Sequence, residues 1–367
     1  MKLTVKTLQL QELVSKAIKG ASNNKMIPIT WLIAIELKSN TLTLTTTDAT
    51  NNLKVLAKDI QGEDFYVVVQ ADIFSKLVAK MTSDNISLTV KDTSLEVVGN
   101  GKYNLEIPLD EEGNGIVIRD KNIEWDMEQT TTNLKTIKTM LTVNKVSLAK
   151  TMEVPCLTAY YVGENILTTN GFKACASDLK VFAQPVLLPA ELVDLLAVID
   201  KDNIIVRQSD KYIEFCTENV IVRGAKLNDE LKNFPVAGMQ GYLSANFPNS
   251  CKISKSQLLA VLDRLLLFIT PYDKNGLYLT FTEKGLQISS KQSTGIEEIL
   301  YTAPATITPF TCCINIELWQ PQVSAIAEEN IEIYFGHSKA IKMVSGEVTQ
   351  ITALLEDDRV TDNGPTA

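Results

Sequence analysis

Aliphatic residues recur at helical spacing in three separate segments of the chain, 10–18, 134–141 and 258–266. Apolar residues three and four positions apart form one face of a helix, so the pattern predicts three amphipathic helices. The segments begin at residues 10, 134 and 258, and successive starts are therefore 124 positions apart. An equal spacing of this kind indicates an internal repeat.

A second helix is predicted in each third of the chain, with a carboxylate in its first turn. These carboxylates are Asp72, Glu191 and Glu317, and a negative side chain at this position is stabilised by the helix dipole. Alternating strands joined by polar turns follow each second helix and begin at residues 85, 203 and 330. Another strand pair lies between the two helices of each third, and its segments are 31–37 with 41–47, 157–162 with 166–169, and 277–281 with 286–290.

The pattern therefore predicts an α+β protein made of three similar domains. Each domain has two helices packed on antiparallel sheets of about eight strands in total. The predicted domains are 1–122, 123–248 and 249–356, and residues 246–250 (NFPNS) near the second boundary have the composition of a connector. The polar segment 357–367 is predicted to be a disordered tail. A repetitive all-β scaffold is the alternative, but the paired helices in register weigh against it.

Composition restricts the classes of function. The chain of 367 residues is 45% hydrophobic and 22% charged, which is ordinary for a folded protein. Its net charge of −9 argues against holding nucleic acid by bulk charge, although a local basic surface remains possible. No apolar run approaches the length of about 20 residues that crosses a bilayer.

Candidate chemistry is sparse. His337 is the single histidine, and we expect it to have a turn or rim role. The six cysteines form no C-x-x-C pair and are interpreted as thiols of a reducing cytoplasm. No P-loop, G-x-S-x-G or H-E-x-x-H motif occurs. The sequence therefore predicts no catalytic residue, no metal site and no cofactor.

Four short runs occur in order along the repeat. They are 25–32 (KMIPITWL), 42–48 (LTLTTTD), 168–174 (TTNGFKA) and 226–235, which begins with KL and ends with FP. These runs are similar to motifs of the bacterial DNA polymerase III beta subunit, the sliding clamp, and the resemblance covers about residues 1–355. The resemblance implies a ring of two chains packed head to tail, with helices lining the hole and sheets forming the outer wall.

The implied function is that of a processivity factor, not an enzyme. Such a clamp encircles double-stranded DNA without reading its sequence and tethers a replicative DNA polymerase, a clamp loader and other partners that carry a clamp-binding peptide. Enclosure retains the DNA, so contacts from Lys and Arg to phosphate can be weak and exchangeable. We expect a cytoplasmic homodimer without membrane contact.

Basic residues on and near the predicted helices are the candidate DNA contacts. Lys25 corresponds to an arginine of the family and is the first candidate. The others are Lys16, Lys19, Lys76, Lys80, Lys135, Lys138, Lys150, Lys255 and Arg264.

The resemblance also implies a peptide-binding pocket between the second and third domains. Its predicted residues are Val154, Thr169, Gly171, Phe172, Lys173, Ala174, Pro235, Asn315, Leu318, Ile351, Thr352, Ala353 and Leu354. Asn170 replaces the usual aspartate, Phe172 replaces a common histidine, and 352–356 (TALLE) replaces the usual apolar-Pro-apolar-Arg ending. These departures suggest a clamp matched to its own polymerase, such as one encoded by a phage or mobile element.

Two further interpretations remain open. The chain could be a clamp-fold adaptor or regulator that binds clamp-binding peptides without encircling DNA, and an enzyme is a third, weaker possibility. For a dimer, the resemblance suggests a seam between an edge strand near 102–108 in one chain and a strand near 302–308 in the other.

Overall fold

The computed structural model describes residues 1–22, 24, 26–119, 122–131, 133–292, 294–301 and 307–356. Lys25, most of the candidate seam strand 302–308 and the predicted tail 357–367 lie outside these residues.

The chain divides into two compact units. Unit 1 consists of Met1–Lys135 and Glu191–Lys226, and unit 2 consists of Thr136–Ala190 and Leu227–Ala367. The middle third of the sequence therefore contributes to both units. The division into three domains at residues 122 and 248 stays a prediction.

Unit 1 contains two antiparallel sheets. The four-stranded sheet has the order β1 (Lys2–Lys6), β6 (Asn85–Val90), β7 (Ser94–Val98) and β8 (Lys102–Glu106). The eight-stranded sheet has the order β5 (Phe65–Gln70), β2 (Leu32–Lys38), β3 (Thr41–Thr47), β4 (Asn52–Ala57), β16 (Val220–Ala225), β15 (Tyr212–Cys216), β14 (Ile204–Gln208) and β9 (Met127–Thr131). Pairing of β4 with β16 joins strands from the first and middle thirds of the chain.

Unit 2 repeats this arrangement. Its four-stranded sheet has the order β20 (Ile296–Leu300), β19 (Gly285–Ser290), β18 (Gly276–Phe281) and β21 (Phe310–Asn315). Its eight-stranded sheet has the order β13 (Val186–Pro189), β10 (Ala159–Val162), β11 (Ile166–Thr169), β12 (Lys173–Ser177), β24 (Val348–Ala353), β23 (Ala340–Ser345), β22 (Asn330–Phe335) and β17 (Asn249–Ser254). Here the pairing of β12 with β24 joins the middle and last thirds.

Seven α-helices lie within the described residues. They are α1 (Thr7–Ala17), α2 (Ala71–Ala79), α3 (Leu134–Lys145), α4 (Ala190–Leu195), α5 (Val236–Ser244), α6 (Lys255–Leu265) and α7 (Ile316–Ala325). Short 3-10 helices occupy Ile18–Gly20, Pro28–Trp31, Pro155–Thr158, Leu196–Val198, Asn228–Asn233, Leu266–Phe268 and Pro271–Asp273. The three helices predicted from aliphatic spacing and the three predicted from a carboxylate in the first turn are confirmed, and α5 was not predicted.

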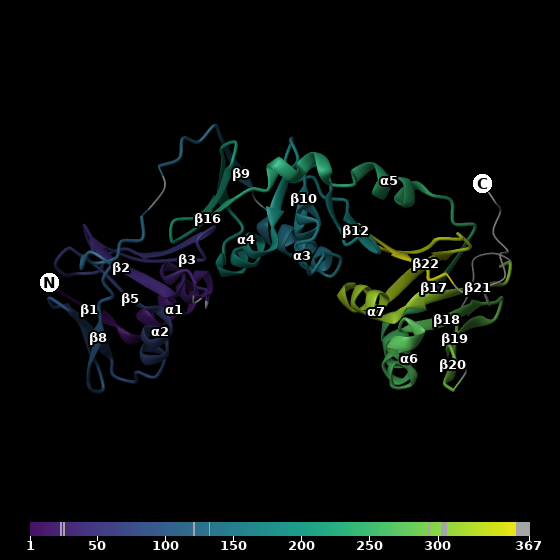
Figure 1. The fold of residues 1–367 in the computed structure, drawn as a ribbon, viewed down its shortest axis with the longest axis horizontal. Helices are drawn as coiled ribbons and strands as arrows, with labels where there is room; N and C mark the ends of the chain where they lie inside the picture. Colours follow the sequence, from purple (N-terminus) through teal and green to yellow (C-terminus); the bar gives the residue numbers. More distant parts are fainter. Residues whose placement is uncertain are drawn as a thin grey trace. The chain divides into compact units, whose positions relative to one another are not determined.

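The helices bury one face each, as their periodicity predicts. In unit 1, α1 packs beside α2 and buries Leu10, Val14 and Ala17 (Figure 1). In unit 2, α6 packs beside α7, where Trp319 is completely buried. The α+β class with paired helices on antiparallel sheets is therefore confirmed.

A carboxylate stabilises the N-terminus of α6. Ser254 is the N-cap and accepts a hydrogen bond from the backbone N–H of Gln257. Glu329 Oε1 accepts from both Ser254 Oγ and Ser256 Oγ at 2.6 Å and from the Ser256 backbone N–H at 3.1 Å. These hydrogen bonds favour the charged form and hold the pKa of Glu329 at about 2.

Replacing Glu329 with Gln should lower the melting temperature at neutral pH, because the amide loses the charge that faces the helix N-terminus. A depressed pKa contributes stability that is present above the ordinary value of about 4.5 and is lost as the pH falls toward 2. The melting temperatures of wild type and Glu329→Gln should therefore converge over that range. The same change at exposed Glu283 is the control, and parallel curves for wild type and Glu329→Gln would contradict the assignment.

Candidate functional site

A hollow of about 220 Å³ lies in unit 2 where β12 meets β24. It is lined by Thr169, Gly171, Phe172, Lys173, Ala174, Pro235, Gly238, Met239, Tyr242, Lys339, Ala340, Ile351 and Ala353. We call it the β12–β24 cavity. Most of these residues are apolar or small, and no carboxylate is among them.

Strand register explains which residues share the cavity. Ala174 lies opposite Ile351, and the backbone N–H of Ala353 donates to the carbonyl oxygen of Phe172 at 2.8 Å. Side chains alternate between the faces of a sheet, so Phe172, Ala174, Ile351 and Ala353 lie on the same face of the junction. Helix α5 packs next to β24 and contributes Met239 and Tyr242 to the lining.

Burial divides the cavity into a floor and a rim. Ile351 is 5% exposed and Met239 is 6% exposed, whereas Phe172 is 65% exposed. An exposed aromatic ring beside a buried apolar floor is typical of a surface that receives an anchor side chain.

The turn before β12 is fixed by its own side chains. Thr169 Oγ1 donates to the carbonyl oxygen of Lys173 at 2.8 Å and accepts from the Gly171 N–H at 3.0 Å. Asn170 Oδ1 accepts from the N–H groups of Phe172 and Lys173 at 3.0 and 2.9 Å. Gly171 has φ of 90°, a value that glycine adopts readily. The amide of Asn170 thus supplies the acceptor oxygen that a carboxylate would supply at the same position.

The opposite face of the junction is held by Gln322 of α7, a residue that the sequence did not indicate. Its Nε2 donates to the carbonyl oxygens of Ala174 and Ile351 at 3.0 and 3.3 Å and to Ser147 Oγ at 3.1 Å. Thr352 Oγ1 donates to Gln322 Oε1. Gln322, Ser147 and Thr352 are completely buried. One amide therefore ties helix α7 to both strands behind the cavity.

Eight of the thirteen predicted peptide-binding residues line the cavity, and the other five lie elsewhere. Thr352 faces Gln322, while Leu354 forms an isolated β-bridge with Ile314 and packs on the core. Asn315 is the N-cap of α7 and accepts from the Glu317 N–H at 2.9 Å. Leu318 is half-buried on α7, and Val154 is 48% exposed.

Five lining residues were not predicted, namely Gly238, Met239, Tyr242, Lys339 and Ala340. Three of them belong to α5, where two glycines obscure the helical pattern. The apolar residues that follow Pro235 were the available signal. A role in peptide binding stays a prediction for all residues of the cavity.

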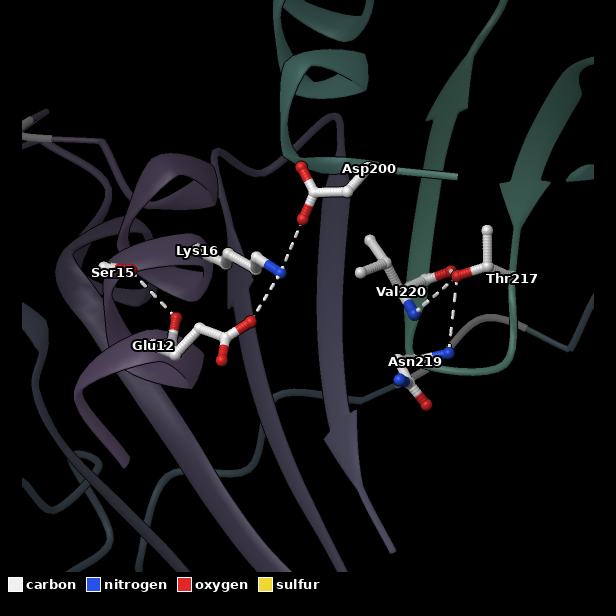
Figure 2. Close-up of polar contacts among 7 residues, drawn as sticks. All are labelled: Glu12, Ser15, Lys16, Asp200, Thr217, Asn219 and Val220. Atoms are coloured by element: carbon white, nitrogen blue, oxygen red, sulfur yellow. Dashed lines mark hydrogen bonds and ion pairs between the residues drawn. The ribbon is translucent and has the colours of Figure 1, made fainter. Parts of the chain in front are cut away.

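Several candidate DNA contacts are paired within the chain. Lys16 Nζ lies 3.0 Å from Glu12 Oε1 and 2.8 Å from Asp200 Oδ2, inside unit 1 (Figure 2). The hydrogen bond to Asp200 is the largest influence that raises the pKa of Lys16, and Glu12 adds to it.

Figure 2 also shows the turn that precedes β16. In this turn Thr217 Oγ1 accepts from the N–H groups of Asn219 and Val220.

Three other candidate cations also have partners. Lys76 pairs with Asp72 at 2.8 Å, Arg264 Nε donates to Glu297 Oε1 at 2.8 Å, and Lys255 donates to the Ile326 carbonyl oxygen. Lys19, Lys80, Lys135 and Lys150 are exposed, as are the paired Lys76 and Arg264, and Lys138 is half-buried. Contact with DNA stays a prediction for each of them.

Within the described part of the chain, no helix is long and apolar enough to cross a membrane, and no three His, Cys, Asp or Glu side chains are grouped to hold a metal ion. The six cysteines are buried and unbridged, and burial raises the pKa of Cys175 and Cys251 to about 12. His337 Nδ1 accepts from the Lys339 N–H at 3.1 Å. Burial is the main cause that lowers the pKa of His337, and Lys339 contributes.

Comparison with protein families matches residues 1–112 to the N-terminal domain of the DNA polymerase III beta subunit. No curated protein is recognisably similar to the chain in sequence.

Solved structures resemble the chain over nearly its whole length. The DNA polymerase III beta subunit of Thermotoga maritima is 16% identical, with 97% of this chain and 99% of that chain covered and a TM-score of 0.81. The beta subunit of Borrelia burgdorferi, solved in complex with a natural product, is 18% identical with the same coverages and a TM-score of 0.82. The sliding clamp of Bacillus subtilis is 15% identical, again with coverages of 97% and 99%, and has a TM-score of 0.81. The chain therefore has the sliding-clamp fold, and the resemblance inferred from its motifs is confirmed for the fold and for the N-terminal domain.

Replacing Gln322 with Leu should lower the free energy of unfolding by about 2–4 kcal/mol, because buried groups that lose a hydrogen-bond partner cost about 1–3 kcal/mol each. The measurement is equilibrium denaturation. Gln320→Leu is a matched control two residues away, since Gln320 bonds to Asp263 at a more exposed position. It should cost less than about 1 kcal/mol. Equal losses in the two variants would show that Gln322 has no special role at the junction.

Proposed function

We propose that this chain is a DNA sliding clamp, a processivity factor that acts without catalysis. Two copies close head to tail into a ring around double-stranded DNA, with helices inside and sheets outside, and hold a replicative polymerase. The observation that carries the proposal is the clamp fold over 97% of the chain together with the family match of residues 1–112. A clamp loader that opens the ring and a cytoplasmic location, where these partners work, belong to the same proposal.

The seam of the dimer is proposed to join β8 of one chain to β20 of the other. Both are end strands of four-stranded sheets, and an end strand presents unpaired backbone groups that can pair with another chain. Tyr103 on β8 is 41% exposed, while Ile296 and Leu300 on β20 are 55% and 75% exposed. Strand β8 lies within the segment 102–108 suggested by the sequence. On the other side, most of the suggested segment 302–308 lies outside the described residues, and β20, which ends at Leu300, is the proposed strand.

The β12–β24 cavity is proposed to receive the clamp-binding peptide of the polymerase and other partners. Its buried floor at Met239 and Ile351 suits an aliphatic or aromatic anchor, and exposed Phe172 extends the apolar contact at the rim. Binding of a peptide in the cavity does not require a closed ring. Holding the polymerase on DNA does require one. No observation favours the alternative of an adaptor that does not encircle DNA.

Retention on DNA is proposed to depend on enclosure. The chain carries a net charge of −9, and several candidate cations are paired internally, so bulk attraction for phosphate is weak. The exposed lysines, such as Lys19 and Lys150, can make brief contacts that let the ring slide.

Wild type should sediment with about twice the 40.5 kDa mass of the chain. Leu300→Asp should sediment as a monomer, because a charge at the seam loses its solvation when the strands pair. Leu8→Asp is the matched control, since Leu8 is also highly exposed, at 82%, but lies on α1. A dimer that persists in Leu300→Asp, or wild type that is monomeric at every concentration, would contradict the seam.

Wild type loaded onto nicked circular DNA by its clamp loader should remain bound in high salt and leave when the circle is cut to a linear form. Salt screens charge contacts but does not open a closed ring. The measurement is co-elution of labelled protein with DNA in gel filtration before and after cutting. Loss from the intact circle at moderate salt would mean that charge alone holds the protein, and the function as a clamp would be wrong.

A further inference from the structure

A second and larger hollow, of about 790 Å³, lies beside the β12–β24 cavity within unit 2. We call it the α5 hollow, because helix α5 and the turn 336–339 between β22 and β23 contribute most of its lining. Gly238, Tyr242 and Lys339 line both the hollow and the cavity. The two spaces therefore share a wall, and a peptide anchored in the cavity can continue into the hollow.

The wall between the two spaces is firmly packed. Phe247 is 8% exposed and forms one apolar cluster with Ala340 and Ile351, which line the cavity. On the side of the hollow, the centre of the His337 ring lies 5.2 Å from that of Phe247 and 6.0 Å from that of Tyr242. The buried cluster thus holds side chains of both spaces in fixed positions.

Two glycines leave one face of α5 bare where it borders the hollow. Gly238 and Gly241 lie three residues apart and so point to the same side of the helix. A Cβ at either position would meet no atom within 4 Å. Because glycine weakens a helix but permits close approach of a ligand to the backbone, the open face suits an extended peptide chain.

The polar lining of the hollow favours an acidic occupant. Lys339 is exposed, and no carboxylate is among the lining residues. His337 Nδ1 accepts from the Lys339 N–H, so the neutral ring carries its hydrogen on Nε2 and offers a donor. Burial first and Lys339 second lower the pKa of His337, which keeps the ring neutral at pH 7. A cation and a neutral N–H donor both suit a carboxylate.

We propose that the α5 hollow receives acidic residues that flank the apolar anchor of a clamp-binding peptide, while the anchor itself occupies the β12–β24 cavity. The inference rests on the proposed function, because it takes the cavity to be the anchor site. The shared wall identifies the occupant as a continuation of the same peptide, and charge complementarity at Lys339 identifies its chemistry. The hollow thus lets the protein select partners by residues outside the anchor.

The test uses three fluorescein-labelled peptides that share a central leucine–phenylalanine pair. The core peptide has only serines beside the pair, the glutamate peptide adds glutamates at both ends, and the glutamine peptide has glutamines in their place. Fluorescence anisotropy measures the binding of each peptide to the full chain. The glutamate peptide should bind at least about tenfold more tightly than the core peptide and at least about threefold more tightly than the glutamine peptide.

Gly241→Trp fills the hollow and changes no residue that lines the cavity. The advantage of the glutamate peptide over the core peptide should fall below about twofold, and the affinity for the core peptide should stay within about twofold of wild type. Gly241→Ala favours the helix and adds only a methyl group, so it should keep most of the advantage. Gly115→Trp, at another open glycine in unit 1, is the matched control and should behave as wild type.

Lys339→Gln removes the cation of the hollow. The glutamate and glutamine peptides should then bind this variant within about twofold of each other, because the charge-assisted hydrogen bonds are lost. Lys284→Gln makes the same change at another exposed position of unit 2 and should keep the difference between the two peptides.

Four results would overturn the inference and leave the cavity intact as the anchor site. They are equal affinities of wild type for the core and glutamate peptides, equal affinities for the glutamate and glutamine peptides, an advantage that survives Gly241→Trp, and equal losses in Lys339→Gln and Lys284→Gln. Failure of all three peptides to bind wild type would instead contradict the role of the cavity in the proposed function, and the inference would fail with it.

Discussion

The pairing of edge strands from different repeats is the constraint on which the rest of the structure depends. A strand at the end of a sheet has N–H and C=O groups that must find partners. The chain provides partners twice, by pairing β4 with β16 in unit 1 and β12 with β24 in unit 2. Each pairing extends a sheet to eight strands across a boundary of the sequence repeat.

Both junctions share one backbone design. A threonine and an Asx residue fix each turn through their side-chain oxygens, and the next residue enters the pairing strand. The cross-strand pair that follows the turn differs between the junctions: Ala174 lies opposite Ile351 in one, and Asn52 lies opposite Arg223 in the other. The repeat therefore keeps the geometry of the turn while the side chains that follow it change.

Internal pairing also limits what the basic residues can do. Lys16 lies between two carboxylates, and Arg264 is paired with Glu297. Pairs at the surface contribute little stability, typically about 0–1 kcal/mol, because water and salt screen them. Their larger effect is on the electrostatic potential, since a paired lysine attracts phosphate less than an isolated one. This electrostatic balance is consistent with the proposed retention of DNA by enclosure.

Much of the fold could be predicted from the sequence, because periodicity reports which face of each element is buried. Strands β6 and β22 begin and end at the residues where the alternation does, and three helices lie where aliphatic spacing places them. The helix α5 was missed because Gly238 and Gly241 weaken its helical pattern in the sequence. Its packing against neighbours in unit 2 stabilises the helix. The resemblance indicated the turn at Thr169–Lys173, Ala174, Pro235 and two lining residues of β24, so eight of the thirteen lining residues could be found without a structure.

The sequence by itself determined the order, type and threefold recurrence of the elements, because these depend on local hydrophobic spacing. Only the tertiary structure decided which strands of different repeats pair, and hence that Gln322 lies behind one junction and that Arg119 and Arg223 line the other. The physical reason is that every strand offers the same backbone N–H and C=O groups, so the residues of two strands do not show whether the strands pair. The partners of a side chain become known only when register brings distant residues to opposite positions.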